Sequence, residues 1–167
     1  LNLNGTIDST FNTGLGTSDY IGSLTFQADD KILVGKTYIN SFNGQYFGGI
    51  VRLNPDGSVD DSFHPPALNG SASEILIRDS SIYFSASKDL NGVFGSYLFK
   101  LTPNGGIDNT FNPILLDDTG PFEFCMAFQR NSLIFNSSSL AGNIYGLSLC
   151  DSVGSFVNSF APEISRY

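Results

Sequence analysis

Oxygen-bearing side chains at alternate positions form the segment whose spacing most resembles a chemical site: Asn54, Asp56, Ser58 and Asp60. Ligands spaced in this way open the calcium-binding loops that hold this hard cation. Such a loop also needs a bidentate acid near its twelfth position, which here is Pro65. We therefore expect a turn in which Asp60 and its counterparts Asp8 and Asp108 bond nearby backbone amides, with no metal and no cofactor.

Aromatic rings close to acids and amides indicate a second kind of chemistry, the binding of carbohydrate. An aromatic face stacks on the C–H surface of a sugar, while carboxylates and amides hold its hydroxyls. The predicted rim consists of Tyr38, Phe42, Tyr46, Asp117, Asp118 and Phe122, with Tyr20 as a further ring. The alternative is that these rings pack between sheets as core residues.

Patterns for catalysis are weak. His64 is the single histidine, and it has no second imidazole or thiolate cluster to complete a metal site or a catalytic triad. The sequence holds no nucleophile elbow, phosphate loop or zinc motif. Acid pairs such as Asp29 and Asp30 rarely share a proton, because neighbouring strand residues point to opposite faces. Cleavage of a glycan by two carboxylates is therefore the last alternative. We expect no enzymatic activity.

The two cysteines, Cys125 and Cys150, do not form a disulfide framework. They could lie on neighbouring strands and be bridged. The alternative is that they remain two small apolar side chains.

One short phrase recurs four times and fixes the architecture that must position these residues. The copies are Leu1–Phe11, Leu53–Phe63, Leu101–Phe111 and a degraded Leu149–Phe160. The last copy has one extra residue and carries Val157 where the others have Asp. The phenylalanines that end this closing phrase are 52, 48 and 49 residues apart. A period near fifty is typical of repeat proteins, in which one supersecondary unit cannot bury its apolar face alone.

Each period contains four apolar segments separated by polar turns. In the three repeats, the first segment is Ile21–Phe26, Ala72–Ile77 and Phe124–Phe128. The second segment is Lys31–Tyr38, Ile82–Ser87 and Leu133–Ser137. The third segment is Gly49–Leu53, Tyr97–Leu101 and Ile144–Leu149. The fourth ends at the repeated phenylalanine. Asn-Gly and Asp-Gly pairs supply the positive φ that tight hairpins require. Each repeat is therefore predicted to be a four-stranded antiparallel meander.

The middle segments are continuous apolar runs, although a half-buried strand should alternate. A strand covered on both faces loses that alternation, which favours sheets stacked face to face around an axis. We predict an all-β fold, a β-propeller made of four-stranded antiparallel blades, with about three blades in this chain. Because propellers need about four blades or more, this is a partial ring.

The repeat phase divides the single propeller domain, residues 1–167. Residues 1–11 are the outer strand of a preceding blade, and 12–63, 64–111 and 112–160 are successive repeats. Residues 161–167 start the next connection or form a tail. The chain begins inside a repeat, so we expect the missing blades to come from the same, longer chain or from a second copy.

In such blades, the short first–second and third–fourth turns lie at one end. The longer loops, at the other end, are Thr13–Tyr20, Asn40–Phe47, His64–Ser73, Asp89–Gly95 and Pro113–Phe122. Loops on a rigid scaffold commonly carry binding function, so the predicted rim belongs to this second end.

Composition narrows the range of partners. The net charge is −8 and charged residues make up only 14% of the chain. A nucleic acid or an anionic membrane would require a basic surface, so neither is an expected partner. No apolar run approaches the roughly 18–20 residues of a membrane-spanning helix, so membrane insertion is not expected either.

The closing phrase resembles the bacterial and phage delta-60 repeat of β-propellers, whose pattern is Leu-Asn-x-Asp-Gly-Ser-x-Asp-x-x-Phe. Leu53–Phe63 matches it closely, and Gln27–Gly35 fits the accompanying Gln-x-Asp-x-Lys-Ile-Leu-Val-Gly pattern. The resemblance covers essentially the whole chain and weakens in the last copy. It implies a secreted, surface or phage-borne propeller and supplies no catalytic residues.

These observations favour a non-catalytic structural and recognition module of an extracellular, cell-surface or virion assembly, contacting proteins or a host surface. The alternative is a carbohydrate-binding, lectin-like propeller. A glycan-cleaving enzyme comes third. Further blades, protein partners and a possible glycan are the expected partners.

Overall fold

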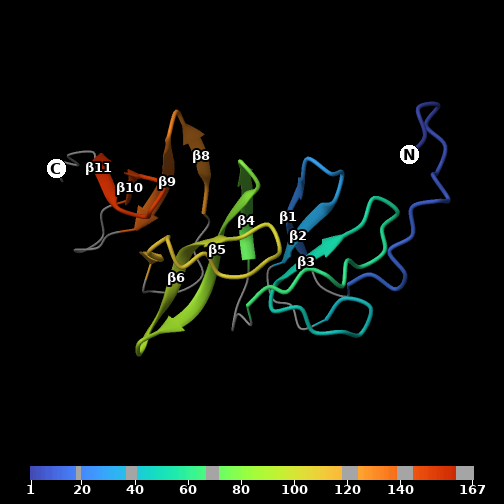
Figure 1. The fold of residues 1–167 in the computed structure, drawn as a ribbon, viewed down its shortest axis with the longest axis horizontal. Helices are drawn as coiled ribbons and strands as arrows, with labels where there is room; N and C mark the ends of the chain where they lie inside the picture. Colours follow the sequence, from blue (N-terminus) through green and yellow to red (C-terminus); the bar gives the residue numbers. More distant parts are fainter. Residues whose placement is uncertain (18–19, 37–40, 67–71, 118–123, 139–144, 161–167) are drawn as a thin grey trace, which may run out of the picture.

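A computed structural model of the chain describes residues 1–17, 20–36, 41–66, 72–117, 124–138 and 145–160. In these residues three antiparallel sheets stand side by side in chain order (Figure 1). Sheet 1 contains β1 (Ile21–Phe26), β2 (Ile32–Lys36) and β3 (Ile50–Leu53). Sheet 2 contains β4 (Ala72–Arg78), β5 (Ser81–Leu90), β6 (Val93–Leu101) and β7 (Ile114–Asp117). Sheet 3 contains β8 (Met126–Gln129), β9 (Ser132–Ser138), β10 (Tyr145–Cys150) and β11 (Phe156–Phe160).

Each sheet is a meander whose strands follow chain order, and the predicted partial β-propeller of about three blades is confirmed. The first strands β1, β4 and β8 contact one another in turn, so they form the hub side of the arrangement. Tight hairpins keep the strands in order. The turn between β5 and β6, for example, places Asn91 and Gly92 at φ 56° and 82°, as a type I′ hairpin requires.

Each repeat is predicted to have four strands, but sheet 1 has three in the described residues, and its closing phrase adds only the isolated bridge Leu53↔Val59. The fourth strand differs from the prediction in sheet 2 as well. The closing phrase there forms only an isolated bridge, Leu101↔Ile107, followed by a turn, and the fourth strand is β7, beyond Phe111. In sheet 3, β11 does end at Phe160 as predicted. The physical reason is the acid of the phrase, because Asp108 folds the chain by bonding the backbone of Thr110. Sheet 2 therefore runs to Asp117, past the sequence boundary at 111.

Apolar clusters fill the two junctions between the sheets. Between sheets 1 and 2, Leu33 and Ile50 pack against residues such as Ile75 and Phe84. Between sheets 2 and 3, Tyr83, Leu98 and Phe111 are joined by Met126, Leu133 and Phe135. A third cluster, which contains Val34, Phe42, Val51 and Leu53, lies on the far face of sheet 1. Burial on both faces explains the continuous apolar runs of the middle strands.

The sequence left the pairing of the cysteines open, and the structure has both thiols free. Cys125 is exposed, whereas Cys150 is buried in the cluster between sheets 2 and 3. Burial, followed by the nearby charge of Asp151, raises the pKa of Cys150 to about 12, so this thiol stays protonated. Within the described ranges, no helix is long and apolar enough to cross a membrane.

Candidate functional site

The closing phrase is a pair of successive turns held by its own acids. Asp60 Oδ1 accepts hydrogen bonds from the amide and hydroxyl of Ser62 at 3.0 and 2.6 Å. Its counterparts Asp8 and Asp108 each bond a threonine two residues ahead in the same way. The predicted turn is confirmed. In the part of the chain that the structure describes, no group of three or more His, Cys, Asp or Glu residues could hold a metal ion.

Arg52 fills the junction between sheets 1 and 2, which we call the first junction. Its Nε donates to Asp60 Oδ2 at 2.7 Å, and its Nη1 reaches the carbonyl of Pro103 in the next sheet's phrase at 2.6 Å. The guanidinium carbon stands 4.7 Å from the centre of the Phe63 ring. Lys31 Nζ adds a second cation 2.7 Å from Asp60 Oδ2. This network ties sheet 1 to sheet 2.

The electrostatic balance at Asp60 shows how strong this network is. Burial raises the pKa of the Asp60 carboxyl. Hydrogen bonds from Lys31, Ser62 and Arg52 outweigh that effect and hold the pKa far below its usual range. The carboxylate therefore stays charged at any physiological pH, which suits a structural ion pair and excludes it as a general acid.

Lys100 takes the place of Arg52 in the second junction, between sheets 2 and 3. The strand registers establish the equivalence, because Arg52 pairs with Leu33 as Lys100 pairs with Tyr83. Lys100 Nζ lies 2.9 Å from Asp108 Oδ2, in the phrase of its own sheet. Bonds from the hydroxyl of Thr110 and then from Lys100 lower the pKa of Asp108 to about 2. Burial lowers the pKa of Lys100, but the bond to Asp108 outweighs it and the net shift is upward.

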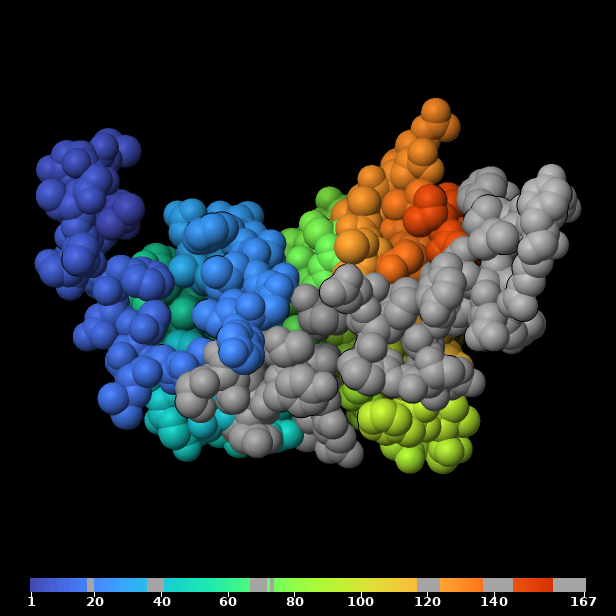
Figure 2. Space-filling view, turned by 180° about the vertical axis from the view of Figure 1, so that it is seen from behind, coloured from blue at the N-terminus to red at the C-terminus, as the bar shows by residue number. Residues whose placement is uncertain are grey.

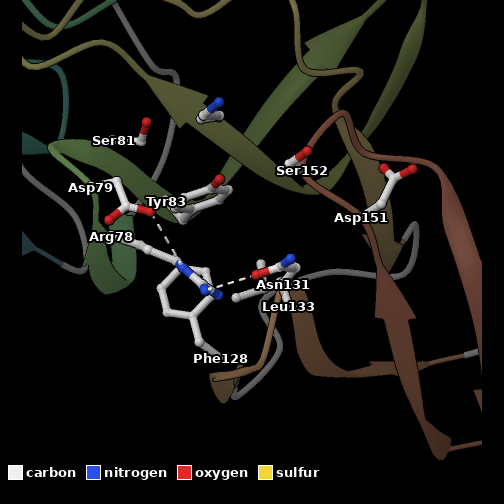
Figure 3. A pocket seen from close by; sticks show the side chains of 10 residues that line it. Arg78, Asp79, Ser81, Tyr83, Phe128, Asn131, Leu133, Asp151 and Ser152 are labelled. Carbon is white, nitrogen blue, oxygen red and sulfur yellow. Dashed lines mark hydrogen bonds and ion pairs between the residues drawn. The ribbon is translucent and has the colours of Figure 1, made fainter.

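With Lys100 in this place, the second junction keeps a groove of about 330 Å³, shown in Figure 3. We call it the second-junction groove, and its walls include Arg78, Tyr83, Lys100, Phe128, Asn131 and Ser152. Ser152 stands where the corresponding phrase of sheet 2 has Pro103, whose carbonyl receives Arg52 at the first junction. At the first junction an arginine therefore bonds this backbone position, whereas at the second junction the corresponding residue lines the groove.

The groove sets aromatic rings beside polar groups. Arg78 lies over the ring of Phe128, 5.0 Å from its centre, and its Nη2 donates to Asn131 Oδ1 at 3.4 Å (Figure 3). The Tyr83 ring meets Phe128 edge to face at 5.2 Å. Across the groove, Asp151 Oδ1 accepts hydrogen bonds from two backbone amides of its own turn. This arrangement suits a small ligand that has both an apolar face and hydrogen-bonding groups.

The predicted rim is only partly within the described residues. Phe42 is buried in the third apolar cluster, so its ring acts as core, whereas Tyr46 is 56% exposed. Tyr20 is also exposed. Asp117 ends β7, where its backbone pairs with Ser96. The remaining rim residues, Tyr38, Asp118 and Phe122, lie outside the described residues.

Loops at the predicted rim end do meet. The amide of Asn43 donates to the carbonyl of Gly16 at 2.9 Å, and the amide of Gly16 donates to Asn43 Oδ1 at 2.8 Å. This joins the loop before β1 to the loop between β2 and β3. The second-junction groove lies at the opposite end, among the short turns. The changes from Arg52 to Lys100 and from Pro103 to Ser152 are the signals in the sequence that could have indicated it.

Comparison with known proteins supports the architecture. A family model described as a domain of unknown function (DUF5122), beta-propeller, matches residues 27–63. That span begins at Gln27 and ends at Phe63, so it contains both sequence patterns noted above. No match was found among curated proteins. Together with the three sheets, this match defines the class: a β-propeller repeat protein.

Proposed function

We propose that this chain is a non-catalytic structural and recognition propeller of the delta-60 kind, which works in an extracellular, cell-surface or virion assembly by contacting other proteins or a host surface. The observation that carries the proposal is the contrast between the junctions. One is closed by the Arg52 network, and the other presents a groove on the same rigid sheets. A rigid scaffold with one opened position suits recognition.

The use of the acids supports a non-catalytic role. Asp60 and Asp108 are held charged by cations and by their own turns, and Asp151 accepts two backbone amides. General acid catalysis needs a carboxyl whose pKa lies near the working pH, which Asp60 and Asp108 do not offer. These acids contribute to the scaffold.

Surface location is the part of the proposal to test first. We expect an antibody against this chain to label intact producing cells or the particles that they release, and added protease to remove the label. Retention of all the protein inside protease-protected cells, with none on released particles, would refute the proposal.

Recognition through the groove is tested with a double variant, Arg78→Ala with Asn131→Ala, and with Lys88→Ala as the matched control outside the groove. Each variant is labelled and titrated onto the producing cells or their released particles, and separately onto target host cells. We expect the double variant to bind at least about tenfold more weakly than the control, as the loss of a charge-assisted contact predicts. Equal binding by both variants would exclude the groove as the contact.

Carbohydrate binding is the second candidate, favoured by Phe128 and Tyr83 beside Asn131 in the groove and by the exposed Tyr46 at the other end. A glycan array followed by calorimetry tests it. Loss of binding in Phe128→Ala would place the sugar in the groove, and loss in Tyr46→Ala would place it at the predicted rim. A flat array response from the intact assembly would reject this candidate.

A further inference from the structure

The two internal junctions are built to one rule. We call the face of a sheet that packs on the preceding sheet its lower face, and the opposite face its upper face. At each internal junction the lower face of one sheet packs on the upper face of the sheet before it. Residues Ile75, Ile82 and Phe84 are the lower face of sheet 2 against the upper face of sheet 1, Leu33 and Ile50. Met126, Leu133 and Phe135 are the lower face of sheet 3, against Tyr83 and Leu98 of sheet 2.

Sheet 1 carries the same lower face, and none of the three described sheets packs on it. By strand register, Leu24, Ile32 and Val34 correspond to Ile75, Ile82 and Phe84 of sheet 2. Leu24 is 59% exposed, whereas Ile75 is 3% exposed. Together with Phe11, Phe26 and Phe42, these residues line an apolar hollow of about 480 Å³.

Sheet 3 carries the matching upper face, and none of the other described sheets packs on that face. Leu147 corresponds to Ile50 and Leu98, because each stands at the same pairing position of its third strand. Leu147 is 50% exposed, whereas both counterparts are fully buried. The two ends of the row of sheets therefore hold the two halves of the interface that is already used twice inside the molecule.

A backbone hydrogen bond marks each junction and is present at the open end of sheet 1 as well. The residue after each closing phenylalanine donates its amide to the turn of the next phrase. The three bonds are Asn12 to Asp56 at 2.7 Å, His64 to Asn104 at 3.0 Å and Asn112 to Val153 at 3.0 Å. The first of them fixes Phe11 at the edge of the hollow, which is the place that a closing phenylalanine takes in a junction.

Sheet 3 leaves room for that phenylalanine. Val157 replaces the acid that bends the phrase at Asp60 and Asp108, and the chain continues as β11 with a bulge at Val157. As a result the backbone of Phe160 pairs with Leu147 instead of turning into the next junction. The N-terminal arm stands clear of the body in Figure 2. It leads to Phe11, which lines the hollow of sheet 1 and can serve there as the closing phenylalanine of a junction with sheet 3 of another copy.

We propose that two copies of this chain associate head to tail, with the upper face of sheet 3 of each copy packed on the lower face of sheet 1 of the other. A head-to-tail contact forms a closed ring when its rotation closes, and two copies would give two identical junctions. Six sheets lie within the four to eight blades that propellers use. The inference rests on the fold and is independent of the proposed function.

Sedimentation equilibrium over a concentration series tests the proposal. We expect a species of twice the 18.0 kDa of one chain. Added salt should strengthen association, because each copy carries a net charge of −8. At the internal junctions, Ser23 and Glu74 accept the backbone amides of Ile75 and Met126 from the next sheet. Cys125 is the residue of sheet 3 that corresponds to Ser23 and Glu74, so it would lie in the new junction and can report on its formation. Alkylation of Cys125 should slow as the dimer forms.

Charged substitutions separate the two faces. Leu24→Asp and Leu147→Asp should each weaken association by about 30-fold or more, because a buried unpaired carboxylate is costly. The matched control is Val93→Asp, at an exposed apolar residue in the turn region between β5 and β6, and it should associate like the wild type. Both sites are exposed in one chain, so circular dichroism should show folded monomers.

Mixing the two variants sharpens the test. Each retains one intact face, so a mixture of Leu24→Asp and Leu147→Asp should form a heterodimer through one junction, while each alone stays monomeric. A wild type that remains at 18.0 kDa at every concentration would overturn the proposal, and these faces would then belong to another polypeptide. Unchanged association of Leu24→Asp would overturn it as well.

Discussion

The first and second junctions share the bond from the residue after the closing phenylalanine to the next phrase, and they differ in the cations that line them. At the first, Arg52 bonds Asp60 on its own sheet and the Pro103 carbonyl on the next, so the end of the junction is closed. At the second, Lys100 bonds Asp108, and a groove of about 330 Å³ remains. A branched, planar guanidinium can serve two sheets at once, whereas an ammonium acts as a point charge. A repeat protein can thus open a binding position without altering its scaffold.

Removing each cation should separate the junctions most strongly. Arg52→Met removes one of the two cations bonded to the buried Asp60 and leaves Lys31 and the Ser62 bonds, and we expect a loss of about 3 kcal/mol in the free energy of unfolding. Lys100→Met should cost about 1 kcal/mol, because Asp108 is partly solvated and keeps its bonds to Thr110. Urea titration of both variants measures the difference, and equal losses would break the comparison.

Glycines in the phrases test whether both junctions rely on the same close approach. A Cβ on Gly105, which has a positive φ, would come within 2.8 Å of the Phe63 ring, and one on Gly154 would press on the backbone of Asn112. We expect Gly105→Ala and Gly154→Ala each to cost about 2–3 kcal/mol. Gly92→Ala is the control, with a similar φ and open space, and should cost about 1 kcal/mol.

Acid should weaken both junctions through their carboxylates. The folded-state pKa of Asp108 is lowered to about 2, so its contribution to stability is complete above the ordinary pKa of 3.8 and disappears as the pH falls through 2. The pKa of Asp60 is lowered further, so its contribution persists to lower pH. The free energy of unfolding should therefore drop between pH 5 and pH 2 by about 2 kcal/mol for each acid.

The matched variants for this profile are Asp108→Asn and Asp60→Asn. Each should flatten the fall in stability with acid, and Asp60→Asn should also lower stability at neutral pH more than Asp108→Asn does. A pH profile that keeps its full slope in both variants would contradict the assignment of the pKa shifts to these ion pairs.

Exchanging the cations should give the smallest effects and the sharpest comparison. Lys100→Arg should reduce the groove and gain up to about 1 kcal/mol, because a guanidinium can reach the phrase of sheet 3 as Arg52 reaches that of sheet 2. Arg52→Lys should lose about 1 kcal/mol and make the first junction resemble the second. Thermal unfolding measures both, and opposite signs are the expected result.

The sequence predicted much of this fold because its signals are local. Asn-Gly turns, continuous apolar runs and the repeated phrase predict the strands, their order and the bonds made by Asp60 and Asp108. The placement of the fourth strand could not be predicted in the same way. The copy that continues as β11 differs from the copies that bend by Val157 in place of Asp and by one extra residue, and the pairing partner Leu147 lies outside the phrase.

The candidate site shows the same limit. Phe42 belongs to the predicted rim by residue type, but the far face of sheet 1 buries it. The groove combines Arg78, Phe128 and Ser152, which come from three turns and strands on two sheets. Spacing along the chain carries no signal for such a meeting, because each residue is ordinary within its own strand.

Local sequence signals specify the repeat, the meander and the charged turns, since each depends on residues within a few positions of one another. The packing of one sheet on the next settles which junction Arg52 bridges, which junction keeps a groove, and which apolar side chains of sheets 1 and 3, such as Leu24 and Leu147, stay exposed. Those outcomes depend on side chains about fifty residues apart that become neighbours only when one sheet packs on the next, where a single change of cation or acid alters the contact.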